Sequence, residues 1–361
     1  MNFKKSVLCP LLYCLVFNQI LFAAINSDKI GIYFWDGKTK IKAENNIAAG
    51  YLLLKRLGTH SIRITMSPRS NIDYRLGKEC IEDFTLTRLA QRQDFNKFFS
   101  DPQFSTIMIT AYDRATDVCL NNRSYLNPDL YNSLIIRQVQ EEYRQFASYL
   151  GSNFPDKKFI IGHWEGDDAV YCASSYSHDY ENCPQSVKNM VGLILWLNAR
   201  NTGIKLAGVK NVYSAVEFNS VRILRDKNLP DLLNNVIPFV NADYFSYSAY
   251  ESTGPLDLSN KRPDIKKFIE DVAEIKRILA KYNRNPDNLI IGELGFTHNG
   301  RKKIRNKLKI TFDALDDSSV KHIFVWNLLD VGGNFALFYP DGKITPSGKY
   351  LKRLFQHTAN N

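Results

Sequence analysis

Short apolar runs alternate with longer helix-period segments eight times along this chain, and this alternation constrains the fold more than any other feature. Each run is continuously apolar or nearly so, which suits parallel strands buried on both faces better than strands with one solvated face. The expected strands cover 30–35, 61–66, 106–112, 158–164, 209–216, 243–250, 289–294 and 322–328. The expected helices cover 47–57, 86–99, 128–150, 186–201, 230–237, 265–282, 303–315 and 347–355.

Eight strand–helix units in 361 residues predict one α/β domain, a single (β/α)₈ TIM barrel. Such a barrel needs about 250 residues, and the excess falls after the second, third, fourth and sixth strands. We therefore expect extended loops at the C-terminal face of the barrel. A doubly wound open sheet is the alternative, but no glycine-rich phosphate loop follows the first strand.

The first 24 residues have the form of a secretory signal peptide. Lys4 and Lys5 precede an apolar run over 7–24 that ends in small residues. An uncleaved anchor helix is the alternative, but Pro10 and two later polar residues interrupt a span that needs about 20 apolar residues. We therefore expect 1–24 to be removed and 25–361 to form the barrel domain, secreted or periplasmic, with no stable membrane span after processing.

Four cysteines remain after the expected signal peptide, and an even number in an exported chain is typical of disulfide bonds. Cys172 and Cys183 bracket a short polar loop, so a bridge between them is the simplest of the three possible connectivities. Cys80–Cys119 then follows by elimination. A zinc site is not expected, because the chain has no CxxC spacing and only His178 lies near a cysteine.

The balance of charges is basic, with 47 Lys and Arg against 37 Asp and Glu. A positive field favours anionic surfaces or substrates without identifying either. The basic residues are scattered and no nucleic-acid-binding motif occurs, so we expect no nucleic-acid partner. No cofactor is expected, and we expect a monomer. Asp167 and Asp168 with Glu165 could supply oxygen ligands to a divalent cation, but adjacent carboxylates on one loop more often form a solvated turn, so no metal is expected.

Two glutamates stand at the expected carboxyl ends of strands four and seven, which is where such barrels place their chemistry. Glu165 lies in 162–168 (GHWEGDD) and Glu293 in 291–296 (IGELGF). A carboxylate there is partly desolvated, which raises the pKa of one member of a pair so that it acts as an acid. Two carboxylates about 5 Å apart suit double displacement at an anomeric carbon. A helix cap or an ion pair with a barrel arginine is the alternative for each.

Short motifs resemble the (β/α)₈ glycoside hydrolases of clan A, which carry an acid/base glutamate after strand four and a nucleophile glutamate after strand seven. The segment 324–330 (FVWNLLD) resembles the strand-eight segment of β-glycosidases, and 333–350 resembles the closing stretch before the last helix. The segment 61–64 (SIRI) resembles the strand that carries an arginine of the clan. The pattern covers the whole mature chain through short motifs, and no individual family is identified.

The resemblance implies roles for five residues. Glu165 would be the general acid/base, and Glu293 the nucleophile. Arg63 would stabilise the Glu293 carboxylate. Tyr250, ending strand six, would donate a hydrogen bond to the same carboxylate. Trp326 would form the floor under the sugar in the −1 subsite. Packing or core neutralisation is the alternative for Arg63, Tyr250 and Trp326.

One position departs from the clan, whose members carry an asparagine immediately before the acid/base glutamate, against the sugar 2-hydroxyl. Here that position is Trp164. His163 lies on the same strand face as Glu165 by the two-residue period, and is a candidate for the polar role. Glu217, after the expected strand five, is the second-choice acid, because one miscounted strand would make it the strand-four residue.

These observations predict an exported retaining glycoside hydrolase that acts on an oligosaccharide, a polysaccharide or a glycoconjugate. A catalytically inactive carbohydrate-binding barrel is the alternative, favoured by the departure at Trp164, and another class of hydrolase is a third. Aromatic loop residues would supply stacking surfaces for sugar rings. Those residues include Tyr171, Tyr176, Tyr180 and Tyr250.

Overall fold

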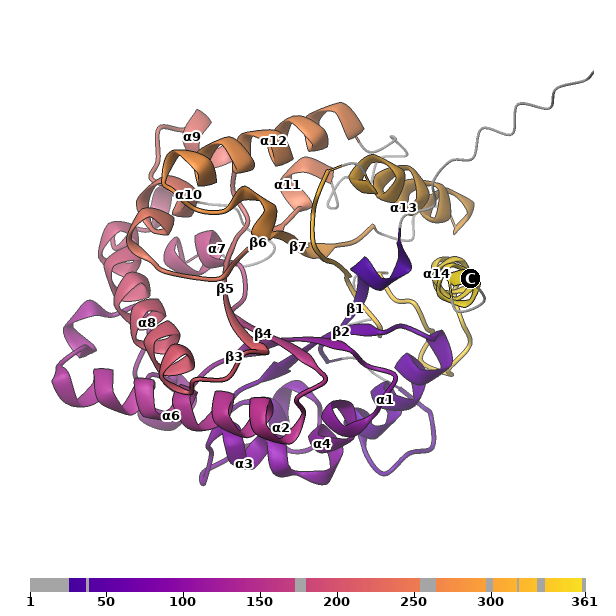
Figure 1. Ribbon diagram of the computed structural model, residues 1–361, viewed down its shortest axis with the longest axis horizontal. Coiled ribbons are helices and arrows are strands. Elements are labelled where there is room, and N and C mark those ends of the chain that lie inside the picture. Colours follow the sequence, from indigo (N-terminus) through magenta and orange to yellow (C-terminus); the bar gives the residue numbers. More distant parts are fainter. Residues whose placement is uncertain are drawn as a thin grey trace, which may run out of the picture.

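A computed structural model describes residues 26–36, 39–172, 180–253, 264–296, 301–316, 318–329 and 335–358. Eight parallel strands form a closed barrel in the order of the sequence, which confirms the expected TIM barrel (Figure 1). The strands are β1 (Ile30–Phe34), β2 (Ser61–Met66), β3 (Thr106–Ala111), β4 (Lys158–Gly162), β5 (Val212–Phe218), β6 (Tyr244–Ser248), β7 (Leu289–Leu294) and β8 (Ile323–Val325). The expected signal peptide lies outside the described residues.

Barrel closure depends on β1, which pairs in parallel with both β2 and β8. Gly31 lies opposite Ser61 on one side and Phe324 on the other. A Cβ atom at Gly31 would lie 2.5 Å from the Phe324 ring, so only glycine fits where β1 and β8 meet. The register shifts within β6–β7 and β7–β8, next to the carboxyl ends that carry the candidate site.

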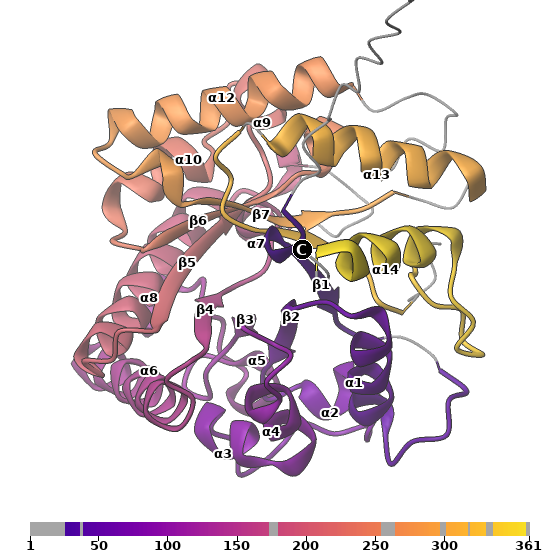
Figure 2. The same cartoon turned by 45° about the vertical axis from the view of Figure 1, so that its right-hand side comes forward.

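Helices surround the barrel on the outside, as the two views of Figures 1 and 2 show. The long helices are α1 (Asn46–Leu57), α6 (Ser133–Asn153), α8 (Ser186–Leu206), α12 (Ile265–Lys281), α13 (Arg301–Asp316) and α14 (Pro346–Thr358). The short helices are α2 (Ser70–Asp73), α3 (Leu86–Gln91), α4 (Gln93–Ser100), α5 (Val118–Asn121), α7 (Gly166–Val170), α9 (Ile223–Asp226), α10 (Leu232–Asn235) and α11 (Tyr250–Thr253). Single 3₁₀ turns are η1 (Ser27–Lys29), η2 (Pro128–Leu130), η3 (Tyr180–Asn182), η4 (Ile237–Phe239) and η5 (Pro286–Asn288).

Local sequence explains where the helices begin and break. The Asn132 side chain accepts hydrogen bonds from the N–H groups of Leu134 and Ile135, which satisfies donors that have no partner inside α6. The expected helix 86–99 is two helices, because Arg92 between them has an extended ψ of 138°. The expected helix 128–150 likewise divides, since Pro128 starts a separate 3₁₀ turn before α6.

Several strands end at other residues than the sequence predicts, and the differences fall on candidate site residues. β4 ends at Gly162, so the segment carrying Glu165 has already left the sheet. β5 runs to Phe218, which places Glu217 inside the strand rather than after it. β6 ends at Ser248, so Tyr250 begins α11 rather than ending the strand. Apolarity marks burial but not the last hydrogen-bonded residue of a strand.

The barrel interior changes from apolar to polar toward the carboxyl ends of the strands. A cluster of buried apolar side chains fills the barrel interior toward the amino ends of the strands. Its members are Met108, Ile160, Ala215, Tyr244, Ile290 and Phe324. Two residues further along their strands stand Thr110, Gly162, Glu217, Ser246 and Gly292. Every second residue of a strand faces the same side of the sheet. The residues two positions after the apolar layer therefore form a second, more polar layer directly above it.

Both expected cysteine pairs lie within disulfide distance. The Cα atoms of Cys80 and Cys119 are 6.3 Å apart, and those of Cys172 and Cys183 are 6.0 Å apart. Disulfide bonds join Cα atoms at about 4.4–6.8 Å. The first pair connects the loop after β2 to α5, and the second closes the loop that follows α7. Among the described helices, none is long and apolar enough to cross a membrane.

Candidate active site

Arg63 lies at the centre of the polar layer, on β2 and fully buried. Its guanidinium binds the Glu217 carboxylate with both terminal nitrogens, at 2.7 and 3.0 Å. It also donates to Thr110 Oγ1 and to the Gly292 carbonyl, and its Cζ atom lies 4.3 Å from the centre of the Tyr33 ring. A buried guanidinium with this many acceptors has a fixed position, so it orders the groups around it.

Glu293 is the penultimate residue of β7 and is only 2% exposed. Its Oε1 atom lies 3.8 Å from Arg63 Nη1, and the Tyr250 hydroxyl donates a hydrogen bond to its carboxylate. Its backbone carbonyl accepts from the Ala249 N–H, which ties β7 to the start of α11. The structure therefore places Arg63, Tyr250 and Glu293 in contact, with Arg63 closer to Glu217 than to Glu293.

Glu165 follows β4, occupies the N-cap position of α7 and is also buried. Its backbone has a φ of +22°, a value that non-glycine residues seldom adopt. Ser248 Oγ donates to its Oε1 atom at 2.7 Å. The Glu165 N–H donates to Glu217 Oε1 at 3.1 Å. The Ser248 hydroxyl beside the Glu165 carboxyl is neutral, whereas the Glu293 carboxyl lies near the positive charge of Arg63.

The two carboxyls differ in how strongly they hold a proton. Burial raises the pKa of Glu165 well above its usual value, and the charge of Glu293 adds to this rise, while the hydrogen bond from Ser248 opposes it. Burial also raises the pKa of Glu293, but Arg63 and the Tyr250 hydroxyl favour its ionised form. When the pair holds one proton, that proton lies on Glu165.

Glu217 joins the same cluster from β5. Its carboxylate accepts from Arg63, from the Glu165 N–H and from Ser246 Oγ, the last at 2.6 Å. Its own N–H donates to His163 Nε2 at 3.1 Å. The sequence predicted that Glu217 follows strand five. It lies within β5 instead, and it faces the barrel interior because it is two residues from Ala215.

His163 and Trp164 lead into Glu165 but are placed differently. The His163 ring is fully buried: Nε2 accepts from the Glu217 N–H and Nδ1 lies 3.2 Å from the Trp164 carbonyl. Burial lowers the pKa of His163 to about 3, so the ring is neutral. Trp164 is half-buried, and its N–H donates to the Tyr112 hydroxyl. Both ring nitrogens of His163 thus contact backbone groups.

Aromatic rings border the cluster on the β1 and β8 side. Trp326 follows β8 and is joined to Asn327 by a cis peptide bond. Its ring meets the Tyr33 ring edge-on at 4.8 Å and lies 5.7 Å from the Trp35 ring. Sequence reasoning missed Trp35, although its place at the carboxyl end of the first apolar run was the available signal.

The acidic residues after Glu165 hold loops together. Asp167 accepts hydrogen bonds from the N–H groups of Asn219, Ser220 and Leu232. Asp168 accepts from the Tyr180 hydroxyl and the Asn219 amide. In the described part of the chain, no group of three or more His, Cys, Asp or Glu side chains is arranged to hold a metal ion.

The loop tyrosines have different surroundings. Tyr171 and Tyr180 are buried and pack edge-on against each other at 5.4 Å, so neither ring offers the expected stacking surface. The Tyr250 hydroxyl contacts Glu293. Tyr176 lies outside the described residues.

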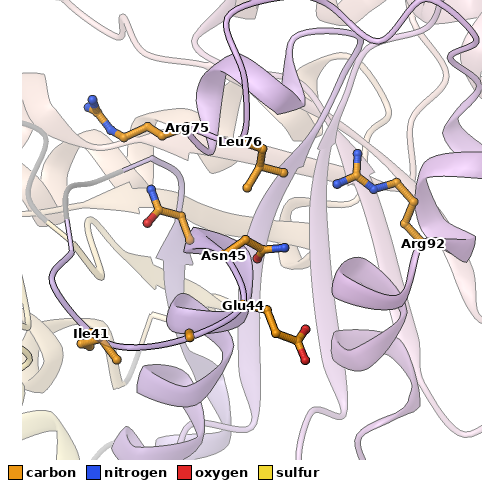
Figure 3. A pocket seen from close by; sticks show the side chains of 8 residues that line it. Ile41, Glu44, Asn45, Arg75, Leu76 and Arg92 are labelled. Atoms are coloured by element: carbon orange, nitrogen blue, oxygen red, sulfur yellow. The ribbon is translucent and has the colours of Figure 1, made fainter.

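A separate cavity of about 450 Å³ lies between the loops that follow β1 and β2 (Figure 3). Figure 3 shows Arg75 and Arg92 on opposite sides of it, with Asn45 and Glu44 between them. Arg75 pairs with Asp36 at 2.6 Å, and Arg92 pairs with Asp94 at 2.8 Å. Its lining residues are Ile41, Ala43, Glu44, Asn45, Asn46, Arg75, Leu76 and Arg92, so the three glutamates of the barrel interior do not contribute to it.

Comparisons of sequence and structure give different results. No family model and no curated protein matches the sequence. The structure is similar to GH5_18 from Streptomyces cattleya in complex with GlcNAc, with a TM-score of 0.58, 12% identity, and coverage of 94% of this chain and 82% of that chain. It is also similar to a hyperthermophilic β-glucosidase from Pyrococcus furiosus, with a TM-score of 0.56, 11% identity, and coverage of 93% and 96%.

A Bacteroides uniformis β-glucuronidase is a larger neighbour, with a TM-score of 0.54, 13% identity and 90% of this chain covered. This chain spans only 34% of that protein's length. At these identities the likeness concerns the fold. The resemblance to barrel glycoside hydrolases is therefore confirmed at that level: the chain has the (β/α)₈ fold that these enzymes share.

Proposed function

We propose that this chain is a retaining glycoside hydrolase that cleaves O-glycosidic bonds by double displacement. One observation carries the proposal. Two buried glutamates at the ends of β4 and β7 have surroundings of different charge, with Arg63 and Tyr250 beside Glu293 and the neutral Ser248 hydroxyl beside Glu165. Such a pair can divide the roles of nucleophile and acid.

In the first step, the ionised Glu293 carboxylate attacks the anomeric carbon while Glu165 gives its proton to the leaving oxygen. The bond between the anomeric carbon and the leaving oxygen breaks, and a glycosyl ester to Glu293 forms. The attack discharges Glu293, and proton transfer leaves Glu165 ionised. The leaving group departs as a neutral alcohol, so the site carries the same total charge before and after the step.

In the second step, the ionised Glu165 takes a proton from water, and the resulting hydroxyl attacks the anomeric carbon. The ester bond to Glu293 breaks, so both glutamates return to their starting states. Each displacement inverts the anomeric carbon, and two inversions give a product of retained configuration.

The proposed substrate is an oligosaccharide, a polysaccharide or a glycoconjugate. Trp326 and Trp35 are half-buried, and Trp326 packs against Tyr33, the ring that lies against Arg63. Their rings could pack against the C–H faces of a sugar. The names of the structural neighbours support a carbohydrate substrate, since they include a β-glucosidase and a complex with GlcNAc.

We further propose that the chain is exported as a monomer, with 1–24 acting as signal peptide and 25–361 as the catalytic barrel. The two cysteine pairs at disulfide distance support this location, because disulfide bonds persist in oxidising compartments. A secreted or a periplasmic protein fits the same observation.

A carbohydrate-binding barrel without turnover is the second candidate. Trp164 favours it, because a tryptophan occupies the position from which the clan's asparagine would contact the sugar 2-hydroxyl. In this case Glu165 and Glu293 would bind the sugar hydroxyls without attacking the anomeric carbon.

The test is hydrolysis of a panel of aryl glycosides, with the first anomer formed followed by proton NMR. Retained configuration is the expected result. Inverted configuration would contradict double displacement. Saturable binding of oligosaccharides without any hydrolysis would favour the second candidate.

A further inference from the structure

A third glutamate has more contacts in the site than either proposed catalytic residue. Glu217 is fully buried, and its carboxylate touches groups from three other segments. It binds Arg63 on β2 at 2.7 and 3.0 Å, Ser246 on β6 at 2.6 Å and the Glu165 N–H after β4 at 3.1 Å. Neither the proposed nucleophile nor the proposed acid has contacts of this number.

We propose that Glu217 is a positioning residue of the site: its carboxylate holds Arg63 away from Glu293 and fixes the backbone that carries Glu165. This inference rests on the proposed function for its catalytic meaning. The contacts themselves are independent of whether the chain hydrolyses anything.

The first part concerns Arg63. The guanidinium is bidentate to Glu217 and lies 3.8 Å from Glu293 Oε1. A nucleophile in a direct ion pair is stabilised before attack and loses that stabilisation as its charge disappears. By taking the close contacts of Arg63, Glu217 leaves Glu293 near the guanidinium charge but not hydrogen-bonded to it.

The second part concerns the backbone of Glu165, whose φ of +22° is unfavourable for a residue with a side chain. Such a conformation persists only where its surroundings hold it. The Glu165 N–H donates to Glu217 Oε1, and its carbonyl accepts from Ala169 in α7. Glu217 therefore fixes one side of the peptide that carries the proposed acid, whose carboxyl contacts Ser248 on β6.

The packing around Glu217 supports the same assignment. Gly292 precedes the proposed nucleophile, and a Cβ atom there would lie 2.2 Å from Glu217 Oε2 and 2.1 Å from Ser246 Oγ. The backbone of β7 thus passes the Glu217 carboxylate too closely for any side chain. The glycine at position 292, next to Glu293, therefore leaves the space that the Glu217 carboxylate occupies.

The charge of Glu217 also acts on both proposed catalytic carboxyls. It disfavours their ionised forms and so raises the pKa of each, together with burial, while Arg63 and Tyr250 act in the opposite sense on Glu293. The titratable and charged groups facing the pair include Tyr33 from β1, Arg63 from β2, Asp168 from α7, Tyr180 from η3, Glu217 from β5 and Tyr250 from α11.

The test uses two variants that separate the effect of the Glu217 charge from the effect of the length of its side chain. Glu217→Gln keeps the size of the side chain and removes its charge. Glu217→Asp keeps a charged partner for Arg63, so it is expected to fold even if the glutamine variant does not, but its shorter side chain cannot reach both Arg63 and the Glu165 N–H. Glu142→Gln is the matched control, because Glu142 accepts backbone N–H groups outside this cluster.

The readouts do not require turnover. Carbon-13 NMR of protein labelled at the glutamate carboxyl, assigned with Glu165→Gln and Glu293→Gln, follows the titration of both carboxyls. In Glu217→Gln we expect both pKa values to fall by about one unit or more, because a like charge a few ångströms away is removed. Glu142→Gln should move neither. In Glu217→Asp we expect amide hydrogen exchange at Glu165 to become at least about tenfold faster.

Unchanged titration of both carboxyls in Glu217→Gln would overturn the effect of its charge on the pair. Unchanged exchange at Glu165 in Glu217→Asp would overturn the positioning role. Both results are read on protein without substrate, so they are distinct from a failure of the proposed function. If the titration and exchange change as expected but the parent hydrolyses no glycoside, the positioning role stands and the hydrolase proposal fails.

Discussion

Two groups of carboxylates stand near the carboxyl ends of barrel strands, and they differ in how their oxygens are used. The first is the site cluster, formed by Glu165, Glu217 and Glu293. The second is the β3-end cluster, formed by Asp113 after β3 and Glu142 on α6. Burial raises pKa values in both, with that of Glu142 reaching about 8. A raised pKa therefore does not by itself distinguish a reactive site from a structural one.

The β3-end cluster serves to hold loops. Asp113 accepts from the Trp196 indole N–H at 2.7 Å and from the hydroxyl and N–H of Thr116. Glu142 accepts the N–H groups of Leu86 and Arg114, one with each oxygen. Apart from Trp196, which lies within α8, these donors belong to a loop or to the first turn of a helix.

The site cluster leaves an acceptor unused. Among the described residues, Oε1 of Glu293 is buried without a hydrogen-bond partner, and its nearest cation is 3.8 Å away. A buried acceptor in this state is unfavourable for the folded protein. An oxygen without a hydrogen-bond donor therefore separates Glu293 from Asp113 and Glu142, whose carboxyl oxygens each accept a hydrogen bond.

The largest effect is expected from replacing the residue with the unused oxygen. Glu293→Ala should abolish turnover of every substrate, because no nucleophile remains. Added azide should then attack the anomeric carbon directly and give a glycosyl azide of inverted configuration, which NMR identifies. Residual turnover near the parent rate would place the nucleophile elsewhere.

Glu165→Ala should have a large effect that depends on the substrate. A general acid contributes about 10²–10⁴-fold, and substrates with good leaving groups need little protonation. We expect a loss of this size in kcat/KM for poor leaving groups and a small loss for good ones, with azide giving the product of retained configuration. Parent-like activity on poor leaving groups would mean that another residue supplies the proton, and Glu217 would be replaced next.

Ser248→Ala should have a moderate effect, because it removes one hydrogen bond to Glu165 and no charge. A single hydrogen bond contributes about 0.5–1.5 kcal/mol, so kcat should fall by about tenfold or less. The bond favours the ionised form of Glu165, so the basic limb of the pH–rate profile should move to higher pH. A shift to lower pH would contradict this role of the hydroxyl.

Glu142→Gln should leave activity unchanged and alter stability only. At low pH the protonated carboxyl of the parent and the amide of the variant each offer one carbonyl acceptor to the two backbone N–H groups, so the free energy of unfolding should differ there by less than about 1 kcal/mol. In the parent, the raised pKa of Glu142 means that the folded state holds this proton longer than the unfolded chain. Stability from this group is therefore full below about pH 4 and is lost as pH rises toward 8.

Urea unfolding from pH 4 to pH 8 measures how the free energy of unfolding depends on the protonation of Glu142. The parent should lose stability over the range more steeply than Glu142→Gln, and a parallel decline would remove Glu142 as its cause. A change in kcat in the same variant would break the distinction between the two clusters.

The sequence predicted the barrel because burial on both faces of parallel strands leaves a local pattern that repeats eight times. It also placed Glu165 and Glu293 at strand ends, since an acidic residue beside glycine after an apolar run is a local signal. Arg63 and Tyr250 were named only through resemblance to a family, and the structure places both beside Glu293.

The contacts across the barrel could not be predicted in the same way. Arg63 was expected to act on Glu293, yet its close partner is Glu217, because the choice depends on the register and stagger of β2, β5 and β7. His163 shares a strand period with Glu165 in the sequence, but β4 ends at Gly162, so the alternation no longer applies. Such details arise where strands leave the sheet.

The most direct test of the central claim is trapping with a 2-fluoro glycosyl substrate followed by mass spectrometry of the labelled peptide. The fluorine slows both displacements, and a good leaving group lets the first proceed so that the ester accumulates. We expect a label on the peptide that contains Glu293, and no label in Glu293→Ala. A label on the peptide that contains Glu165 or Glu217 would contradict it.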